Sequence, residues 1–252
     1  MIPYRDENVT TRRSYVTLAL IALNAVAWLT VQGAGAPLPL VRSVCELGLV
    51  AGELTGAVPV GTGFPLGDGA ICTIDPGPQY AHLLTSMFLH GSWMHLLGNM
   101  WFLWLFGDNV EDSMTRPRFV AFYLLCGLAA ALAQVISDPA SGVPMVGASG
   151  AIGGVMGGYL VLYPRVRVFA LVPLGFFITS VALPAWMMLV YWVGLQVLSG
   201  VASIGRSGGG VAFWAHVGGF VAGVLLAKLF ARRDRVVAHQ ARHWRPERVR
   251  WQ

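Results

Sequence analysis

Six apolar stretches constrain the fold of this chain more than any other feature of the sequence. A helix needs roughly 20 residues to cross the ~30 Å hydrocarbon core of a bilayer. The stretches occupy residues 15–33, 92–107, 119–137, 147–163, 183–200 and 211–230. Hydrophobic residues make up 56% of the chain and charged residues 12%, whereas a soluble domain carries about 25% charged residues. We therefore predict an all-α, polytopic membrane protein, a bundle of six transmembrane helices.

The charged residues predict how the chain is organised and oriented. Lys and Arg accumulate in short cytoplasmic loops, and placing both termini in the cytoplasm puts all but two of the 17 Lys and Arg residues there. We divide the chain into a cytoplasmic segment (1–14), a six-span domain (15–230) with a long outer loop (34–80), and a basic cytoplasmic tail (231–252). The first span has no small-residue cleavage site and is expected to stay as an anchor. The Gly-rich and Arg-rich composition favours a bacterial plasma membrane.

The segments between the spans and the three cysteines allow further predictions. Val168 to Ala182 is apolar but interrupted by proline and glycine, which favours an interfacial segment before the fifth span over a seventh crossing. Cys45 and Cys72 share the outer loop, where a disulfide can form, but the sequence does not give their separation. Cys126, within the third span, is expected to be apolar filler. The glycine-rich link from Val201 to Gly210 is expected to form a mobile cap over the site.

Four of the polar residues within or at the start of these apolar spans stand out. They are Ser149 in GASG, His216 in WAHVGG, and both His95 and Asn99 in HGSWMHLLGN. Polar groups in a bilayer are costly, so each requires an explanation. The second, fourth and sixth spans run in the same direction, so their beginnings lie on the same outer side. The four side chains are therefore predicted to converge at similar depth.

Glycines are spaced to let the fourth and sixth spans approach closely. Ser149 shares a helix face with Gly153, beside a stripe that starts at Gly150, and His216 shares a face with Gly219 and Gly223. Small residues at such intervals allow membrane helices to pack tightly. We predict that this packing brings the Ser149 hydroxyl within about 3 Å of an imidazole nitrogen of His216.

The four residues together suit amide hydrolysis by a serine nucleophile. Ser149 would attack and His216 would act as base, while His95, Asn99 and the Ser149 N–H would stabilise the charge that develops on the carbonyl oxygen. The chain has no acid within a span near this site. Asp138 lies on the correct side but beside a proline, where a solvated turn residue is expected. The sequence therefore predicts a dyad.

Each residue also has a plain structural interpretation. Ser149 alone could be a helix cap, and His216 and Asn99 alone could be polar contacts between spans. Only their shared depth and the glycine stripes favour catalysis. His82 and His90 with His95 invite a metal site, but no HExxH pattern or acidic cluster accompanies them, so neither a metal nor another cofactor is expected. The basic tail is expected to bind anionic lipid rather than nucleic acid.

The motifs resemble those of rhomboid proteases over about residues 80–230. They are GASG around Ser149, HxxxN at His95 and Asn99, and AHxxGxxxG from Ala215 to Gly223. The resemblance implies a rhomboid-like six-span bundle with a Ser149–His216 dyad and an oxyanion hole at His95 and Asn99. It also implies cleavage in or near transmembrane segments of membrane-protein substrates that enter beside the second and fifth spans.

Two departures from the family pattern stand out, and two other functions stay open. Many members have Trp-Arg where this chain has Ala81 and His82. In some, an aromatic residue four positions after the nucleophile packs on the histidine, whereas Gly153 stands here. A catalytically silent, client-binding rhomboid-like protein is the main alternative. A small transporter is a weaker one, because the inner halves of the fourth and sixth spans are nearly devoid of polar residues.

Overall fold

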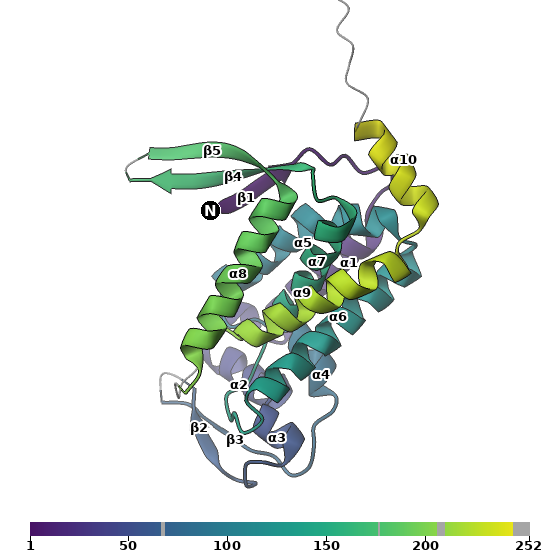
Figure 1. Ribbon diagram of the computed structural model, residues 1–252. Helices are drawn as coiled ribbons and strands as arrows, with labels where there is room; N and C mark the ends of the chain where they lie inside the picture. Colours follow the sequence, from purple (N-terminus) through teal and green to yellow (C-terminus); the bar gives the residue numbers. More distant parts are fainter. Residues whose placement is uncertain (67–68, 176, 206–209, 244–252) are drawn as a thin grey trace, which may run out of the picture.

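The protein is a bundle of helices with small β-sheets at its two ends, as a computed structural model of residues 1–66, 69–175, 177–205 and 210–243 describes it. Six helices run along one another (Figure 1). They are α1 (Tyr15–Thr30), α5 (Trp93–Ser113), α6 (Arg116–Ser137), α7 (Ser149–Leu162), α8 (Ala185–Ser203) and α9 (Phe213–Phe230). The bundle end that carries residues 31–92 is called the loop end here, and the opposite end, which carries strand β1 and helix α10, the terminal end.

The helices of the bundle are apolar, in agreement with the sequence. Among the described residues, α6, α8 and α9 are long and apolar enough to cross a membrane, and α1 and α7 are shorter apolar helices. Helix α5 has 21 residues and ends in the acidic run that includes Asp108, Glu111 and Asp112. Its first turn is capped by the Ser92 hydroxyl, which accepts a hydrogen bond from the N–H of His95, as expected of this residue type.

Helix α7 lies at the centre of the bundle, in contact with α5, α6 and α9. Every residue from Gly150 to Tyr159 is buried. Its 14 residues span roughly 21 Å at 1.5 Å per residue, less than the thickness of a hydrocarbon core. Helix α7 is the shortest of the six bundle helices, and Ser149 is its first residue.

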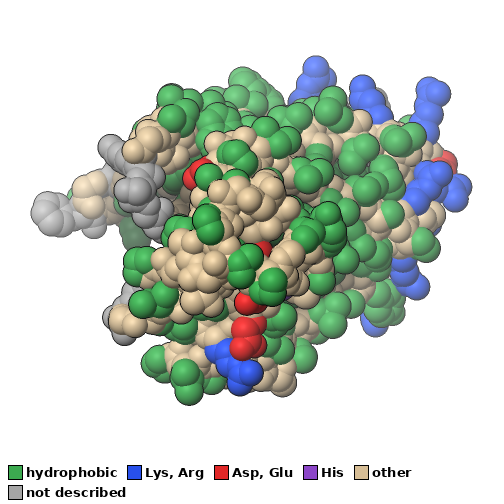
Figure 2. Space-filling model, turned by 90° about the horizontal axis from the view of Figure 1, so that it is seen from below, with side chains coloured by type: hydrophobic (Ala, Val, Ile, Leu, Met, Phe, Trp, Pro, Cys, Tyr) green, Lys and Arg blue, Asp and Glu red, His purple; other side chains and the backbone are tan. Residues whose placement is uncertain are grey.

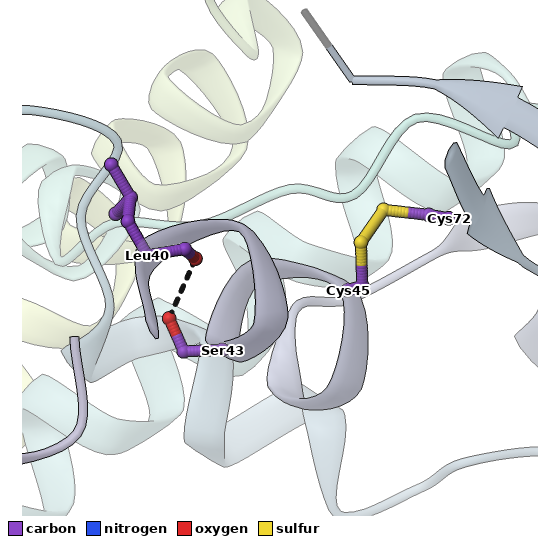
Figure 3. The surroundings of a disulfide bond; sticks show 4 residues. All are labelled: Leu40, Ser43, Cys45 and Cys72. Atoms are coloured by element: carbon purple, nitrogen blue, oxygen red, sulfur yellow. Dashed lines mark hydrogen bonds between the residues drawn. A yellow bond between two sulfur atoms is a disulfide. The ribbon is translucent and has the colours of Figure 1, made fainter. Parts of the chain in front are cut away.

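The loop end contains a compact folded segment rather than an extended loop. It comprises η1 (Gly33–Gly35), α2 (Pro37–Leu47), α3 (Ala51–Thr55), β2 (Gly63–Pro65), β3 (Ile71–Thr73), α4 (His82–Thr85) and η2 (Ser86–Phe88). A disulfide between Cys45 and Cys72 joins α2 to β3 (Figure 3). Seen from below, this end presents mainly hydrophobic and uncharged side chains with a few Asp and Glu among them, and most Lys and Arg side chains stand at the rim of the view (Figure 2).

The prediction of an all-α fold was wrong at the terminal end. Strands β1 (Ile2–Asp6), β4 (Arg167–Leu174) and β5 (Phe177–Pro184) form an antiparallel sheet in the order β1-β4-β5. The apolar segment from Val168 to Ala182 thus forms a hairpin that projects sideways from the bundle (Figure 1). Along β5, exposed residues alternate with partly buried ones, which is the two-residue period of a strand and not the period of a helix.

The first residues and the tail meet at the terminal end. The segment before α1, predicted as a simple flank, supplies β1 and packs on α5. Helix α10 (Arg233–His243) contacts the same end of α5, and the Arg235 guanidinium donates a hydrogen bond to the carbonyl of Met114. Residues 244–252 of the predicted basic tail lie outside the described part of the chain.

Candidate active site

Ser149 and His216 lie in direct contact although 67 residues separate them in the sequence. The Ser149 Oγ is 2.8 Å from the His216 Nε2. Ser149 begins α7 after a turn at Gly147, whose positive φ of 131° suits glycine. His216 lies in the first turn of α9. The N–H of Ala215, the residue before it, donates a hydrogen bond of 3.3 Å to the side chain of Gln134 on α6. The two helices therefore bring the hydroxyl to the imidazole at hydrogen-bond distance.

Glycines let α7 and α9 approach backbone to backbone at this point. A Cβ on Gly219 would overlap the carbonyl oxygen of Gly150, and one on Gly223 would overlap that of Gly154. A Cβ on Gly153 would stand 3.0 Å from the carbonyl oxygen of His216. The four glycines named from the sequence thus all lie at the packed faces that hold Ser149 beside His216.

His95 and Asn99 of α5 line the same cavity as Ser149 and His216. The Nδ1 of His95 accepts the N–H of Gly91 at 3.3 Å, which leaves the proton on Nε2. If Gly147 carried a Cβ, that atom would lie 2.8 Å from the His95 Nε2 and 3.4 Å from the Ser149 Oγ. The Asn99 side-chain nitrogen is buried and has no hydrogen-bond partner. The His95 Nε2–H therefore lies near the Ser149 hydroxyl, and the Asn99 amide nitrogen still has its hydrogen bonds to donate.

A cavity of about 1160 Å³ joins these residues. It is lined by Ser149, His216, His95 and Asn99, with further walls from α6, α8 and the 138–148 connection. Ser203 to Gly205 and Gly210 also line it. Of the predicted cap, Val201 to Ser203 belong to α8, and residues 206–209 lie outside the described residues.

Comparison with known proteins identifies the family of this chain. Residues 77–233 match the model of the Rhomboid domain. This chain belongs to the rhomboid family. It is 28% identical over 150 residues to the mitochondrial Rhomboid protein 1 of Saccharomyces cerevisiae, covering 57% of this chain and 40% of that protein.

Other relatives include proteins named as proteases. The chain is 30% identical over 149 residues to the Rhomboid protease GluP of Bacillus subtilis (59% of this chain, 26% of that protein). It is 32% identical over 146 residues to the Rhomboid-like protease 5 of Toxoplasma gondii (55% and 15%). The matched region is thus less than half of each relative's own length. Rhomboid membership and the apolar helices together make the chain a multi-pass membrane protein.

Helix α8 of this rhomboid domain contributes two side chains that sequence reasoning missed. The Oε1 of Gln196 is 2.8 Å from the Nδ1 of His216. The Trp192 ring packs beside the His216 ring, with centroids 5.8 Å apart and planes 35° apart. Trp192 of α8 therefore makes the aromatic contact with His216 that Gly153 of α7 cannot make. An amide in the middle of an apolar span was the signal available in the sequence.

The remaining candidates have structural partners away from the dyad. The His82 Nδ1 lies 3.7 Å from the Glu53 carboxylate, so the departure at Ala81 and His82 links α3 to α4. His90 is fully buried and packs edge-on against His95. Burial, together with nearby His95, lowers the pKa of His90 to about 3, which keeps this ring neutral. No group of three or more potential metal ligands occurs among the described residues.

Proposed function

We propose that this rhomboid protein is a serine endopeptidase that hydrolyses peptide bonds in or near the transmembrane segments of other membrane proteins. One observation carries the proposal: the Ser149 hydroxyl lies 2.8 Å from the His216 imidazole in the wall of a large cavity. Nucleophile and base within hydrogen-bond reach is the arrangement that activates a serine. No cofactor is required by this chemistry.

The proposed reaction follows the two-step course of serine hydrolysis. The Ser149 Oγ attacks the scissile carbonyl carbon while the His216 Nε2 takes the hydroxyl proton. The carbonyl oxygen becomes negative, and the His95 Nε2–H, the Asn99 amide and the Ser149 N–H stabilise it. The imidazolium then gives its proton to the leaving amine, which leaves an acyl-enzyme. A water from the cavity, deprotonated by His216, hydrolyses the ester and restores Ser149.

The proposal includes a membrane orientation and a class of substrate. With both termini in the cytoplasm and six crossings, nearly all Lys and Arg residues lie on the cytoplasmic side, as the charge rule requires. The loop end and its disulfide then face the outer, oxidising side. Since α5 and α8 both contribute to the cavity wall, a substrate helix entering beside them would reach Ser149.

A cleavage assay in liposomes tests the proposal. The substrate is a single-span protein with small, helix-breaking residues near its outer end, and the enzymes compared are wild type, Ser149→Ala and His216→Ala. Wild type is expected to cleave and both variants, with unchanged melting temperatures, are expected to be inactive. Equal cleavage by Ser149→Ala would refute the dyad. Binding of several such substrates by wild type without cleavage would instead indicate the client-binding alternative.

A further inference from the structure

The middle of α8 is less buried than its two ends. Ala185, Met188 and Leu189 are buried near the terminal end, and Gly200 packs against Phe213 and Trp214 near the loop end. Between Leu189 and Gly200 no residue of α8 is buried. In this stretch, Trp192 and Gln196 are the side chains that contact His216. They lie four positions apart, on one face of the helix.

The contact with Gln196 fixes which imidazole nitrogen carries the proton. Its carbonyl Oε1 can only accept a hydrogen bond, so the His216 Nδ1 must donate. The Nε2 of a neutral imidazole is then unprotonated and can accept the Ser149 hydroxyl proton. The opposite tautomer would turn an N–H toward the nucleophile and could not act as its base.

The contact with Trp192 limits how the imidazole can rotate. The tryptophan ring lies beside the His216 ring and also packs near Phe220, with ring centroids 6.2 Å apart. On the other side, α7 approaches the backbone of His216 at Gly153. Rotation of the ring away from Ser149 would break the Gln196 hydrogen bond and displace the tryptophan.

We propose that α8 positions the proposed base: Gln196 sets the tautomer of His216 and Trp192 sets the orientation of its ring. Neither side chain touches the reacting atoms, so both are positioning residues. Gln196 thus fills the place that an acid occupies in a three-residue serine site, without bringing a charge into the membrane. The expected changes in kcat rest on the proposed function, whereas the expected tautomer of His216 does not.

The structural part is tested without any substrate. Nitrogen-15 NMR of histidine side chains in liposomes, with the His216 signal assigned by its loss in His216→Ala, reports the tautomer. Wild type is expected to show a protonated Nδ1 and a bare Nε2, and Gln196→Met to show a population with the proton on Nε2. A wild-type His216 protonated on Nε2 would overturn the proposal, whatever the variant does.

The kinetic part uses a matched set of variants on α8. Gln196→Met removes the acceptor at similar length, and we expect kcat to fall roughly 10- to 100-fold with KM within about two-fold, because general base catalysis supplies about 10² to 10⁴ in rate. Gln196→Glu keeps an acceptor and is expected to recover most of the lost rate. The control is Leu195→Ala on the exposed face of α8.

Three outcomes separate this inference from the proposed function. Loss of kcat in Gln196→Met with recovery in Gln196→Glu supports it. Equal kcat in wild type and Gln196→Met, with the same tautomer in both, contradicts it and leaves the protease intact. If wild type cleaves nothing, the proposed function fails, and the NMR result alone then decides whether Gln196 sets the tautomer.

Discussion

The two ends of α5 differ in how two buried carboxylates and one buried amide are hydrogen-bonded. At the terminal end the carboxylates are paired: Glu111 accepts hydrogen bonds from the N–H groups of Val16 and Thr17 and from the Thr17 hydroxyl. Asp112 accepts from the N–H and hydroxyl of Thr11. At the loop end, the buried Asn99 amide nitrogen has no partner, and Asn99 is one of the residues that line a large cavity.

This difference separates groups that hold the fold from groups available to a ligand. A buried polar group without a partner lowers stability. A protein that keeps such a group gains from it if the group binds a ligand. The acids of α5 anchor the segment before α1 and cap the start of that helix, since carboxylates are favourable at a helix N-terminus. Polar substitutions at the terminal end should therefore change stability, and those at the loop end should change activity.

The largest expected effect is at Asn99. Asn99→Ala removes one donor to the developing oxyanion, and we expect kcat to fall about 10²- to 10³-fold. Its melting temperature should stay equal or rise, because an unpartnered buried amide is lost. The control is Gly98→Ala, where an added Cβ meets nothing within 4 Å. Substantial destabilisation of Asn99→Ala with full kcat would reverse the assignment.

The Cys45–Cys72 disulfide gives the loop end its own source of stability. It closes a segment with a sequence separation of 27 residues, for which the loop-entropy relation gives about 3.5 kcal/mol. The double variant Cys45→Ala/Cys72→Ala should melt at a lower temperature. Reducing agent should lower the melting temperature of wild type and leave that of the double variant unchanged. No response of wild type to reductant would show that the bond does not stabilise the protein.

Glu111 provides the corresponding test at the terminal end. Glu111→Gln weakens its three hydrogen bonds to the start of α1, and we expect a loss of about 2 kcal/mol in the free energy of unfolding. The control is Glu46→Gln, which alters an exposed pair with Arg42 and should change stability by less than about 0.5 kcal/mol. The kcat of folded Glu111→Gln should match wild type; a large fall in kcat at unchanged stability would contradict the comparison.

A smaller effect is expected from Asp6, which is half-buried and accepts the Tyr159 hydroxyl at 2.6 Å. Burial, partly offset by that hydrogen bond, raises the pKa of Asp6 from 3.8 to about 6. The folded state therefore binds the proton more tightly, and stability should fall as the pH rises from about 4 to about 6.

Asp6→Asn tests this pH dependence by thermal melting at a series of pH values. The fall in stability with pH should be smaller in the variant than in wild type. Nearby Asp108 remains in the variant, so some dependence should persist. Identical pH profiles of the two proteins would show that Asp6 makes no contribution.

The sequence predicted the helices and the contact between Ser149 and His216 better than the structure around them. Apolar stretches of bilayer length located all six helices, and Ser149 and His216 were recognisable as polar residues beside glycines. The sheet was missed because β1 pairs with β4 across 160 residues and neither strand has a marked pattern. Gln196 was missed because its significance depends on the orientation of α8 toward α9, which the sequence of one helix does not specify.

Labelling with a serine-reactive fluorophosphonate, mapped by peptide mass spectrometry, tests the central claim most directly. The reagent needs an activated hydroxyl but no knowledge of the substrate. Wild type should be labelled at Ser149, and His216→Ala should lose that label while keeping its melting temperature. Ser141→Ala, which alters another serine of the cavity wall, should be labelled like wild type. Equal labelling of Ser149 in His216→Ala, or labelling only at other serines, would contradict a Ser149 nucleophile activated by His216.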